Sequence, residues 1–334
     1  MSRGRLLVAA IFAALVATPA APSPTPAPSC ALSRADKAWL DRAVRAWTFT
    51  ARNITHLRLP SRFEARIFNA HCVLASGTAL AGGPNRWSAM RHSGRIKLPN
   101  GEVISAGVTS FAFSDGRKGF FVMSTPSVWR AGKVDGGPLG LDTLMVAVLI
   151  HEGSHVDQVP TYGRRMEELS RRYHLPASFS DDSIQERFAS NAAFAASVGR
   201  ETNLLLESSR AKSRSDALRL AREARALMRE RQERWFTGGD SYLATAEDIW
   251  LTMEGSAQWA GYRWLIDPKG GGYAPAVAET GFGTRGKWWS QKEGFALFMA
   301  LDRLTRGEWK AHAFGDGAQT GLQMLDAALS EPAR

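Results

Sequence analysis

The sequence contains few cysteines, and this limits the kinds of site that it can build. Cys30 and Cys72 are the only two among 334 residues. Neither has a second ligand residue at metal-binding spacing, so a cysteine-based zinc site is excluded. In an oxidising compartment the two cysteines can pair and tie the N-terminal segment to the first predicted strand. A lipid-anchored Cys30 is disfavoured, because the preceding Pro-Ala-Pro-Ser lacks the leucine that is expected there.

Long apolar runs are absent beyond the N-terminal segment, which argues against a membrane-spanning chain. Within that segment, the apolar run Leu6–Val16 follows Arg3 and Arg5 and precedes several small residues. This is the pattern of a signal peptide, and the run is too short for a membrane anchor. We expect residues 1–21 to be cleaved on export and the proline-rich residues 22–32 to form a flexible leader. The mature protein would then be secreted or periplasmic, without a stable membrane anchor.

Acidic residues are outnumbered by basic ones. Lysine and arginine total 42, aspartate and glutamate total 32, and the net charge is +10. Removal of residues 1–21, which hold two arginines and no acid, lowers it to +8. The arginines are spread along amphipathic helices, with no basic run interleaved with aromatic residues, so nucleic acid is not an expected partner. Anionic surfaces of a cell envelope suit this charge better.

The hydrophobic pattern predicts one helix followed by an antiparallel sheet in the N-terminal part. Apolar residues recur at helical spacing over residues 34–52. Residues 63–74 alternate in a strand-like pattern, residues 103–113 are rich in β-branched and aromatic side chains, and residues 120–123 form a matching strand. We therefore expect an antiparallel sheet within residues 60–130.

Helices dominate the chain from residue 136 onward. Asp142 can cap a helix that runs to about Asp157, and Thr245 with Asp248 resembles a capping box. Further helices are predicted over residues 182–208, 215–235, 245–264 and 288–304. The prediction is an α+β protein, in which residues 33–135 form a helix and an antiparallel sheet and residues 136–330 form a helical part. We expect the two parts to make one catalytic unit.

The pattern His151-Glu152-Gly153-Ser154-His155 lies near the end of the first of these helices. Residues four apart share one face of an α-helix, so both imidazoles can bind one metal ion. The apolar stretch Leu144–Ile150 precedes the pattern and predicts a buried helix, where two histidines without a metal would need other polar partners. Zn²⁺ is the expected ion, because imidazole ligands with an open position are typical of catalytic zinc sites.

Glu152 is the predicted general base. It lies one residue after His151, close enough to hold a water molecule on the metal without binding the ion itself. Zinc makes such a water more acidic, and Glu152 would take its proton as the water attacks a carbonyl carbon. The pattern therefore predicts a zinc-dependent hydrolase, with peptides or proteins as the first candidate substrates.

A third zinc ligand has to come from a distant part of the chain. Glu254 is the leading candidate, and Gly255 beside it allows another backbone to come close. Glu293 is an alternative because it lies in a similar Glu-Gly-x-Ala sequence. Glu186 is another, because it follows the histidine pair at a shorter interval. All three glutamates are on predicted helices.

Two short stretches, residues 144–158 and 247–262, resemble the gluzincin-type zinc metallopeptidases. The resemblance implies that Glu254 is the third ligand, as in the corresponding segment of gluzincin aminopeptidases. Gln258 stands where these enzymes carry a carboxylate that orients a ligand histidine, and Asp157 is a second candidate for that role. The 98 residues between the second histidine and Glu254 exceed the spacing of the best-known members, so no subfamily is assigned.

A hydrogen-bond donor is also needed for the oxyanion of the transition state. Among only five tyrosines, Tyr262 is the first choice because it follows Glu254 by two helical turns. Tyr242 and Tyr273 are the alternatives. Packing of Tyr262 in the core is an equally good explanation of its place in the sequence.

Three functions fit these observations. The first is a secreted gluzincin-like metallopeptidase, in which an exposed edge of the predicted sheet holds an extended peptide by strand addition. The second is a zinc hydrolase of a cell-envelope or other non-protein amide. The third is a non-catalytic envelope protein that retains the motif. Glu152 argues against the third, because a structural zinc site has no use for a carboxylate beside its ligands.

Overall fold

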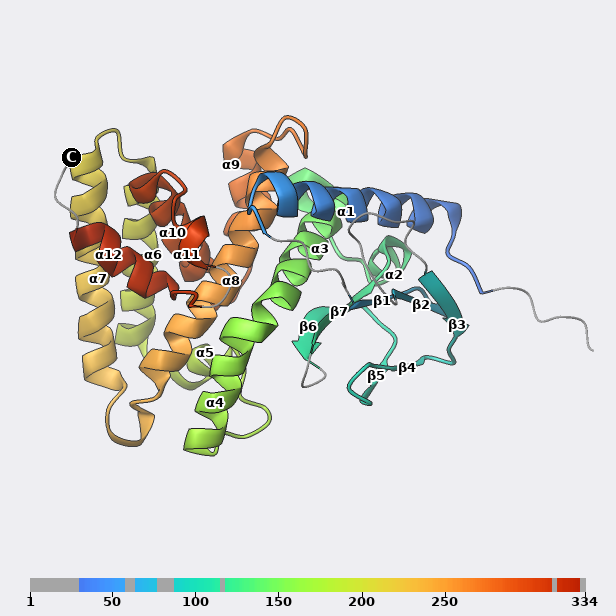
Figure 1. Cartoon of the computed structure of the whole chain (residues 1–334), viewed down its shortest axis with the longest axis horizontal. Coiled ribbons are helices and arrows are strands. Elements are labelled where there is room, and N and C mark those ends of the chain that lie inside the picture. The colour runs from blue at the N-terminus through green and yellow to red at the C-terminus, as the bar shows by residue number, and fades with distance from the viewer. Residues whose placement is uncertain (1–29, 58–63, 77–86, 115–117, 314–316, 331–334) are drawn as a thin grey trace, which may run out of the picture.

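The computed structural model describes residues 30–57, 64–76, 87–114, 118–313 and 317–330. The protein has the predicted α+β arrangement: a sheet lies at one end, a group of helices lies at the other, and two long helices pass between them (Figure 1). The predicted signal peptide and most of the predicted leader lie outside the described residues. Among the described helices, none has the length and apolar character to cross a membrane.

The N-terminal part consists of one long helix, α1 (Arg34–Asn53), and a set of short strands. The strands are β1 (Glu64–Phe68), β2 (Cys72–Ser76), β3 (Trp87–Arg91), β4 (Arg95–Lys97), β5 (Val103–Ser105), β6 (Ser110–Ser114) and β7 (Gly119–Ser124). Five of them form one sheet in the order β3-β2-β1-β7-β6, and β4 pairs with β5. Strand β6 is therefore at an edge of the larger sheet.

This sheet is mixed, so the prediction of purely antiparallel pairing was wrong. Strands β1 and β7 run parallel, with Ala65 opposite Phe121, and the other neighbouring strands of the sheet run antiparallel. A parallel pair requires a long crossover connection. Here the chain from β2 to β6 forms that connection, which local alternation of apolar residues does not reveal.

Both long predicted strands are divided. Residues 63–74 contain β1, a turn and the start of β2, because the Asn69 side-chain oxygen accepts the backbone N–H groups of His71 and Cys72 at 2.9 and 2.8 Å. Such an Asx turn reverses the chain. Residues 103–113 supply β5 to the small sheet and β6 to the large one.

The C-terminal part is helical. The longer helices are α3 (Leu141–Gln158), α4 (Arg164–Tyr173), α6 (Ala192–Arg210), α7 (Arg214–Trp235), α8 (Leu243–Ile266), α10 (Trp289–Thr305) and α12 (Gly321–Ser330). The short helix α2 (Pro126–Ala131) precedes this part. The shorter helices within it are η1 (Gly137–Leu139), η2 (Val159–Gly163), α5 (Ser183–Phe188), η3 (Gly238–Asp240), α9 (Pro275–Ala278), η4 (Glu279–Gly283) and α11 (Lys310–Ala313). The predicted helix over residues 182–208 is thus two helices, because Asn191 accepts N–H groups of the next turn and starts α6.

Ser33 caps α1 as its place before the helix suggests, by accepting the Asp36 N–H, but the caps predicted at Asp142 and Thr245 were wrong. Asp142 lies inside the first turn of α3, and its carboxylate pairs with Arg130. Helix α8 begins before Thr245, without a side-chain cap. The Asp248 carboxylate instead accepts the Thr320 hydroxyl and a backbone N–H at the start of α12, so it anchors a segment that is distant in sequence.

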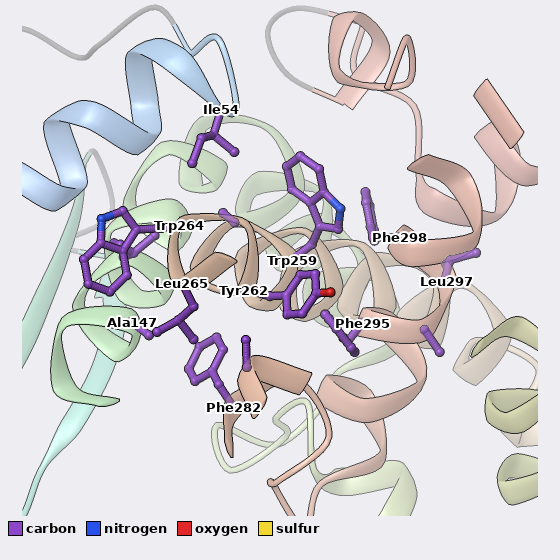
Figure 2. Packing of buried hydrophobic residues seen from close by; sticks show 14 of the residues in the cluster. Ile54, Ala147, Trp259, Tyr262, Trp264, Leu265, Phe282, Phe295, Leu297 and Phe298 are labelled. Atoms are coloured by element: carbon purple, nitrogen blue, oxygen red, sulfur yellow. The ribbon is translucent and has the colours of Figure 1, made fainter. Parts of the chain in front are cut away.

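Helix α8 is central to the core, where it packs against α3 and α10. Figure 2 shows Trp259, Tyr262 and Leu265 of α8 among Phe295 of α10 and Phe282 of η4. These residues belong to one hydrophobic cluster that also includes side chains of α1 and β1. The N-terminal and C-terminal parts therefore share a core.

Helices α8 and α10 cross at two glycines. A Cβ atom on Gly255 would lie 2.3 Å from the backbone oxygen of Gly294, and a Cβ on Gly294 would lie 2.8 Å from the Cα of Gly255. The predicted close backbone approach at Gly255 is thus confirmed. It also explains why Glu254 and Glu293 stand in similar Glu-Gly sequences, because the glycines serve the crossing.

The predicted disulfide bond between Cys30 and Cys72 is present. It joins the residues just before α1 to β2, two segments separated by 42 positions. The bond therefore holds the N-terminal end of the described chain on the sheet, as the sequence suggested.

Candidate metal centre

The two histidines of the motif lie on the inner face of α3. The apolar run before them is buried, with Val146, Leu149 and Ile150 at 0% exposure. This burial fixes the helix in the core and carries His151 and His155, at 6% and 8% exposure, into the interior. Their Nε2 atoms are 2.9 Å apart, as expected for two imidazoles four residues apart on one helix.

Glu254 reaches the same point from α8. Its carboxylate oxygens are 3.3 Å from the Nε2 of His151 and 3.1 Å from the Nε2 of His155. In a tetrahedral site with ligands at about 2.1 Å from zinc, the ligand atoms are about 3.4 Å from one another. The three side chains therefore form a buried cluster whose size suits one divalent metal ion.

The charges of the cluster also suit a cation. Burial disfavours a charged imidazole, but the Glu254 carboxylate, the charge of Glu152 and the hydrogen bond to Gln158 together outweigh this effect and raise the pKa of His155 to about 9. Burial opposes ionisation of Glu254 as well, yet the two imidazoles hold the pKa of that carboxyl well below its ordinary value. A divalent ion would replace the bound proton, so metal binding would release protons near neutral pH.

Gln158 orients one of the histidines, a role that the sequence had suggested for Gln258 or Asp157. The Nδ1 of His155 donates to the Gln158 side-chain oxygen at 2.8 Å. The Gln158 amide donates to the Ser256 hydroxyl at 2.8 Å and the Met253 carbonyl at 3.1 Å. Gln158 thus fixes the imidazole and joins the two ligand-bearing helices. Its position three residues after His155 was the available signal, because residues at that spacing are neighbours on a helix.

Gln258 and Asp157 serve other purposes. Gln258 donates to the backbone carbonyl of Phe282 at 2.7 Å and so ties α8 to η4. Asp157 has a buried carboxylate oxygen without a hydrogen-bond partner among the described residues. Burial raises the pKa of Asp157 to about 7. Neither side chain is bonded to a histidine of the cluster.

The predicted general base has an unpredicted partner. Glu152 is 7% exposed and accepts the hydroxyl of Ser110 at 2.6 Å. Ser110 is the first residue of the edge strand β6, which packs against α3. The general-base candidate therefore lies between the metal cluster and the edge of the sheet. No spacing rule in the sequence links Ser110 to α3, a helix that begins 31 residues later at Leu141.

The predicted oxyanion donor Tyr262 lies in the hydrophobic core. It is 4% exposed and makes an edge-on ring contact with Phe295, 5.2 Å between centroids (Figure 2). Eight residues of helix place it about 12 Å along the axis from Glu254. Tyr242 packs against Tyr173, and Tyr273 donates to the Leu139 carbonyl. Among the described residues, none of these three tyrosines is hydrogen-bonded to His151, His155 or Glu254.

The two alternative ligands are elsewhere. Glu293 belongs to a buried group around Arg231, together with Glu201 and Glu247. Glu186 is exposed on α5. The cluster thus contains Glu254, the leading candidate from the sequence, and neither alternative.

Asp181, just before α5, is an acidic neighbour of the cluster that no sequence pattern indicated. Burial and the charge of Glu254 raise the pKa of Asp181 to about 8. Its side chain also accepts the Ser290 hydroxyl of α10 at 3.4 Å.

Comparisons of the chain with protein-family models, curated proteins and solved structures gave no match.

Proposed function

We propose that this chain is a zinc-dependent hydrolase of gluzincin type that cleaves peptide bonds. The observation that carries the proposal is the buried cluster of His151, His155 and Glu254, with Glu152 beside it. Two imidazoles and one carboxylate are a known ligand set of catalytic zinc sites, in which a further position is left for water or substrate. Within the described chain these are the three residues that meet, fewer than the four protein ligands of an ordinary structural zinc site.

Glu152 is the general base of the proposed reaction. Bound zinc would lower the pKa of water and polarise the substrate carbonyl. The Ser110 hydroxyl holds one oxygen of the Glu152 carboxylate, so the other oxygen is assigned to take the proton. Glu152 then gives this proton to the leaving amine, which completes hydrolysis with no net change in the residue.

Peptides are the proposed substrates because of the edge strand. Strand β6 pairs with β7 on one side and is the last described strand of the sheet. An extended peptide can form backbone hydrogen bonds along such an open edge. Because Ser110 of β6 contacts Glu152, a peptide bound there would present its carbonyl groups beside the general base.

Secretion of this hydrolase, or its export to the periplasm, stays a prediction from the N-terminal sequence.

Metal analysis of the purified protein tests the first half of the proposal. We expect one equivalent of zinc, retained in Glu186→Ala and lost in His151→Ala and Glu254→Ala. Circular dichroism of each variant shows whether its fold is intact. Less than one equivalent of bound zinc in the wild type after incubation with excess metal would reject the zinc site.

Peptide cleavage tests the second half. A mixture of peptides analysed by mass spectrometry should show cleavage by the wild type. Glu152→Gln should retain zinc and lose turnover by at least a hundredfold, because general acid–base catalysis contributes about 10² to 10⁴. Zinc-loaded protein that cleaves envelope-derived amides and no peptide would replace the peptidase proposal by the envelope alternative. Zinc-loaded protein without any hydrolytic activity would support the non-catalytic one.

A further inference from the structure

An open groove with about 510 Å³ of free volume lies among α4, α7, α8 and the start of α12. Its walls are formed by Arg165, Arg225, Gln232, Ala244, Thr245, Asp248, Ile249, Thr320, Leu322 and Gln323. On α8, Asp248 precedes Glu254 by six residues, which places it roughly 120° around the helix axis from that side chain. The groove therefore lies on another side of α8 and shares no residue with the metal cluster.

Arg165 brings to this groove a positive charge that has no ion-pair partner among the described residues. Its guanidinium donates to the Ala318 carbonyl and lies 5.5 Å from the centre of the Tyr162 ring. The neighbouring Arg164, by contrast, faces Glu168 at 4.0 Å. Neutral groups therefore hold Arg165 in place, and its charge stays available for a ligand.

Arg225 contributes a second guanidinium, of which one edge is in use. Its Nε and Nη2 atoms donate to the two carboxylate oxygens of Asp326 at 2.9 and 3.0 Å. The Nη1 atom is buried and has no hydrogen-bond partner among the described residues. An unsatisfied buried donor is costly, so an acceptor added beside it would be stabilising.

The other polar side chains of the groove also offer donors. Among the described residues, the Thr245 hydroxyl and the Gln323 side-chain N–H groups donate no hydrogen bond. The Asp248 carboxylate is already in use, because it accepts the Thr320 hydroxyl and the Leu322 N–H. The start of α12 faces the groove as well, and the positive end of a helix dipole favours an anion.

Positive charge is in excess around the groove. Asp326 pairs with Arg229 as well as with Arg225, so one carboxylate serves two cations. The charged side chains in and beside the groove are three guanidiniums and two carboxylates, those of Arg165, Arg225, Arg229, Asp248 and Asp326. Its apolar wall is formed by Ala244, Ile249 and Leu322. Guanidinium groups match the oxygens of carboxylate and phosphate, and the apolar wall suits a short hydrocarbon chain beside them.

We propose that this groove binds a small organic anion, a carboxylate or phosphate group on a short apolar stem. The bound anion would join α4 to α7, α8 and α12. A carboxylic acid and a phosphate ester are the two sources of such a group, represented here by butyrate and n-butyl phosphate. The proposal does not rest on the hydrolase function, because it needs neither the metal ion nor Glu152.

Calorimetric titration of the purified zinc-free protein tests the site, and removal of zinc keeps the anions from binding to a metal ion. The wild type should bind one equivalent of butyrate or n-butyl phosphate and no 1-butanol, which has a similar stem and no charge. The anion that binds more tightly identifies the source. Arg165→Gln should bind it at least about tenfold more weakly, because a charge-assisted hydrogen bond is lost. Arg164→Gln, the same charge change at the preceding, exposed residue of α4, is the matched control and should bind like the wild type.

Urea unfolding gives an independent readout of the same site. A ligand that binds only the folded protein raises the unfolding midpoint, so the anion should raise it in the wild type and in Arg164→Gln. The rise should be smaller in Arg165→Gln at the same anion concentration, and the transition itself shows whether this variant is folded. Thr245→Val is a second variant that removes one hydroxyl donor and no charge, and it should bind the anion at least about threefold more weakly.

Two results would overturn the proposal. One is the absence of saturable binding of either anion by the wild type. The other is equal binding by Arg165→Gln and Arg164→Gln, because binding would then follow the net charge of the protein and not this groove. If Arg165→Gln is unfolded, the comparison of Thr245→Val with the wild type decides, and equal binding by those two proteins would reject the site.

Discussion

Replacement of Gln158 by alanine should weaken zinc binding by about 10- to 100-fold, which is the usual effect of losing a residue that orients a metal ligand. Gln158 is 0% exposed and makes three hydrogen bonds, to His155, Ser256 and Met253. The weaker binding corresponds to about 1.4 to 2.7 kcal/mol. It arises because the His155 imidazole loses the acceptor that holds its Nδ1–H and directs its Nε2 toward the metal.

The same substitution should also destabilise the zinc-free protein. Each hydrogen bond contributes about 1 kcal/mol net, so the loss of three gives about 3 kcal/mol. Competition with a chelating zinc dye measures affinity, and urea unfolding in the presence of a chelator measures stability. The two readouts separate an effect on the metal from an effect on the fold.

Gln258→Ala is the matched control for this experiment. Gln258 is also a buried glutamine, but its recorded bond is to the backbone of Phe282. We expect a loss of about 1 kcal/mol in stability and an unchanged zinc affinity. Equal zinc affinities of Gln158→Ala and Gln258→Ala would refute the reasoning, because they would show that the bond to His155 does not contribute to metal binding.

Three further outcomes are expected. Reduction of the Cys30–Cys72 bond should cost up to about 4 kcal/mol, by the entropy of a loop of 42 positions; an unchanged unfolding midpoint after reduction would contradict this. Gly255→Ala should destabilise the protein because its Cβ meets backbone of α10 at 2.3 Å, whereas Gly199→Ala on open helix surface should not; comparable midpoints for the two would reject the tight crossing. Because burial raises the pKa of Asp157 from 3.8 to about 7, its contribution to stability is fully present below pH 3.8 and is lost as the pH rises through 7. Asp157→Asn should therefore gain stability relative to the wild type at pH 8, measured by urea unfolding of the zinc-free protein, and a relative loss at that pH would contradict the burial argument.

The sequence alone was sufficient for features that depend on local spacing. The His-Glu-x-x-His pattern predicted two imidazoles on one face of a buried helix, and α3 has this arrangement. Glu254 was ranked first as the third ligand because its segment resembles the one that supplies this ligand in gluzincin aminopeptidases and because it lies in a predicted helix before a glycine, and among the described glutamates it is the one in the cluster. The cysteine pair and the α+β arrangement also followed from composition and pattern.

Only the tertiary structure decided the features that join distant segments. The parallel pairing of β1 with β7 depends on a crossover of the chain, and the contact of Ser110 with Glu152 depends on where β6 lies against α3. Gln258 does not orient a ligand histidine because the position of η4 against α8 brings the Phe282 carbonyl to its amide instead. Glu293 looked like a metal ligand in the sequence, but its glycine serves a helix crossing and its carboxyl group faces Arg231. Contacts of this kind depend on how whole helices and strands pack together. Residue spacing along one helix or strand carries no information about that packing.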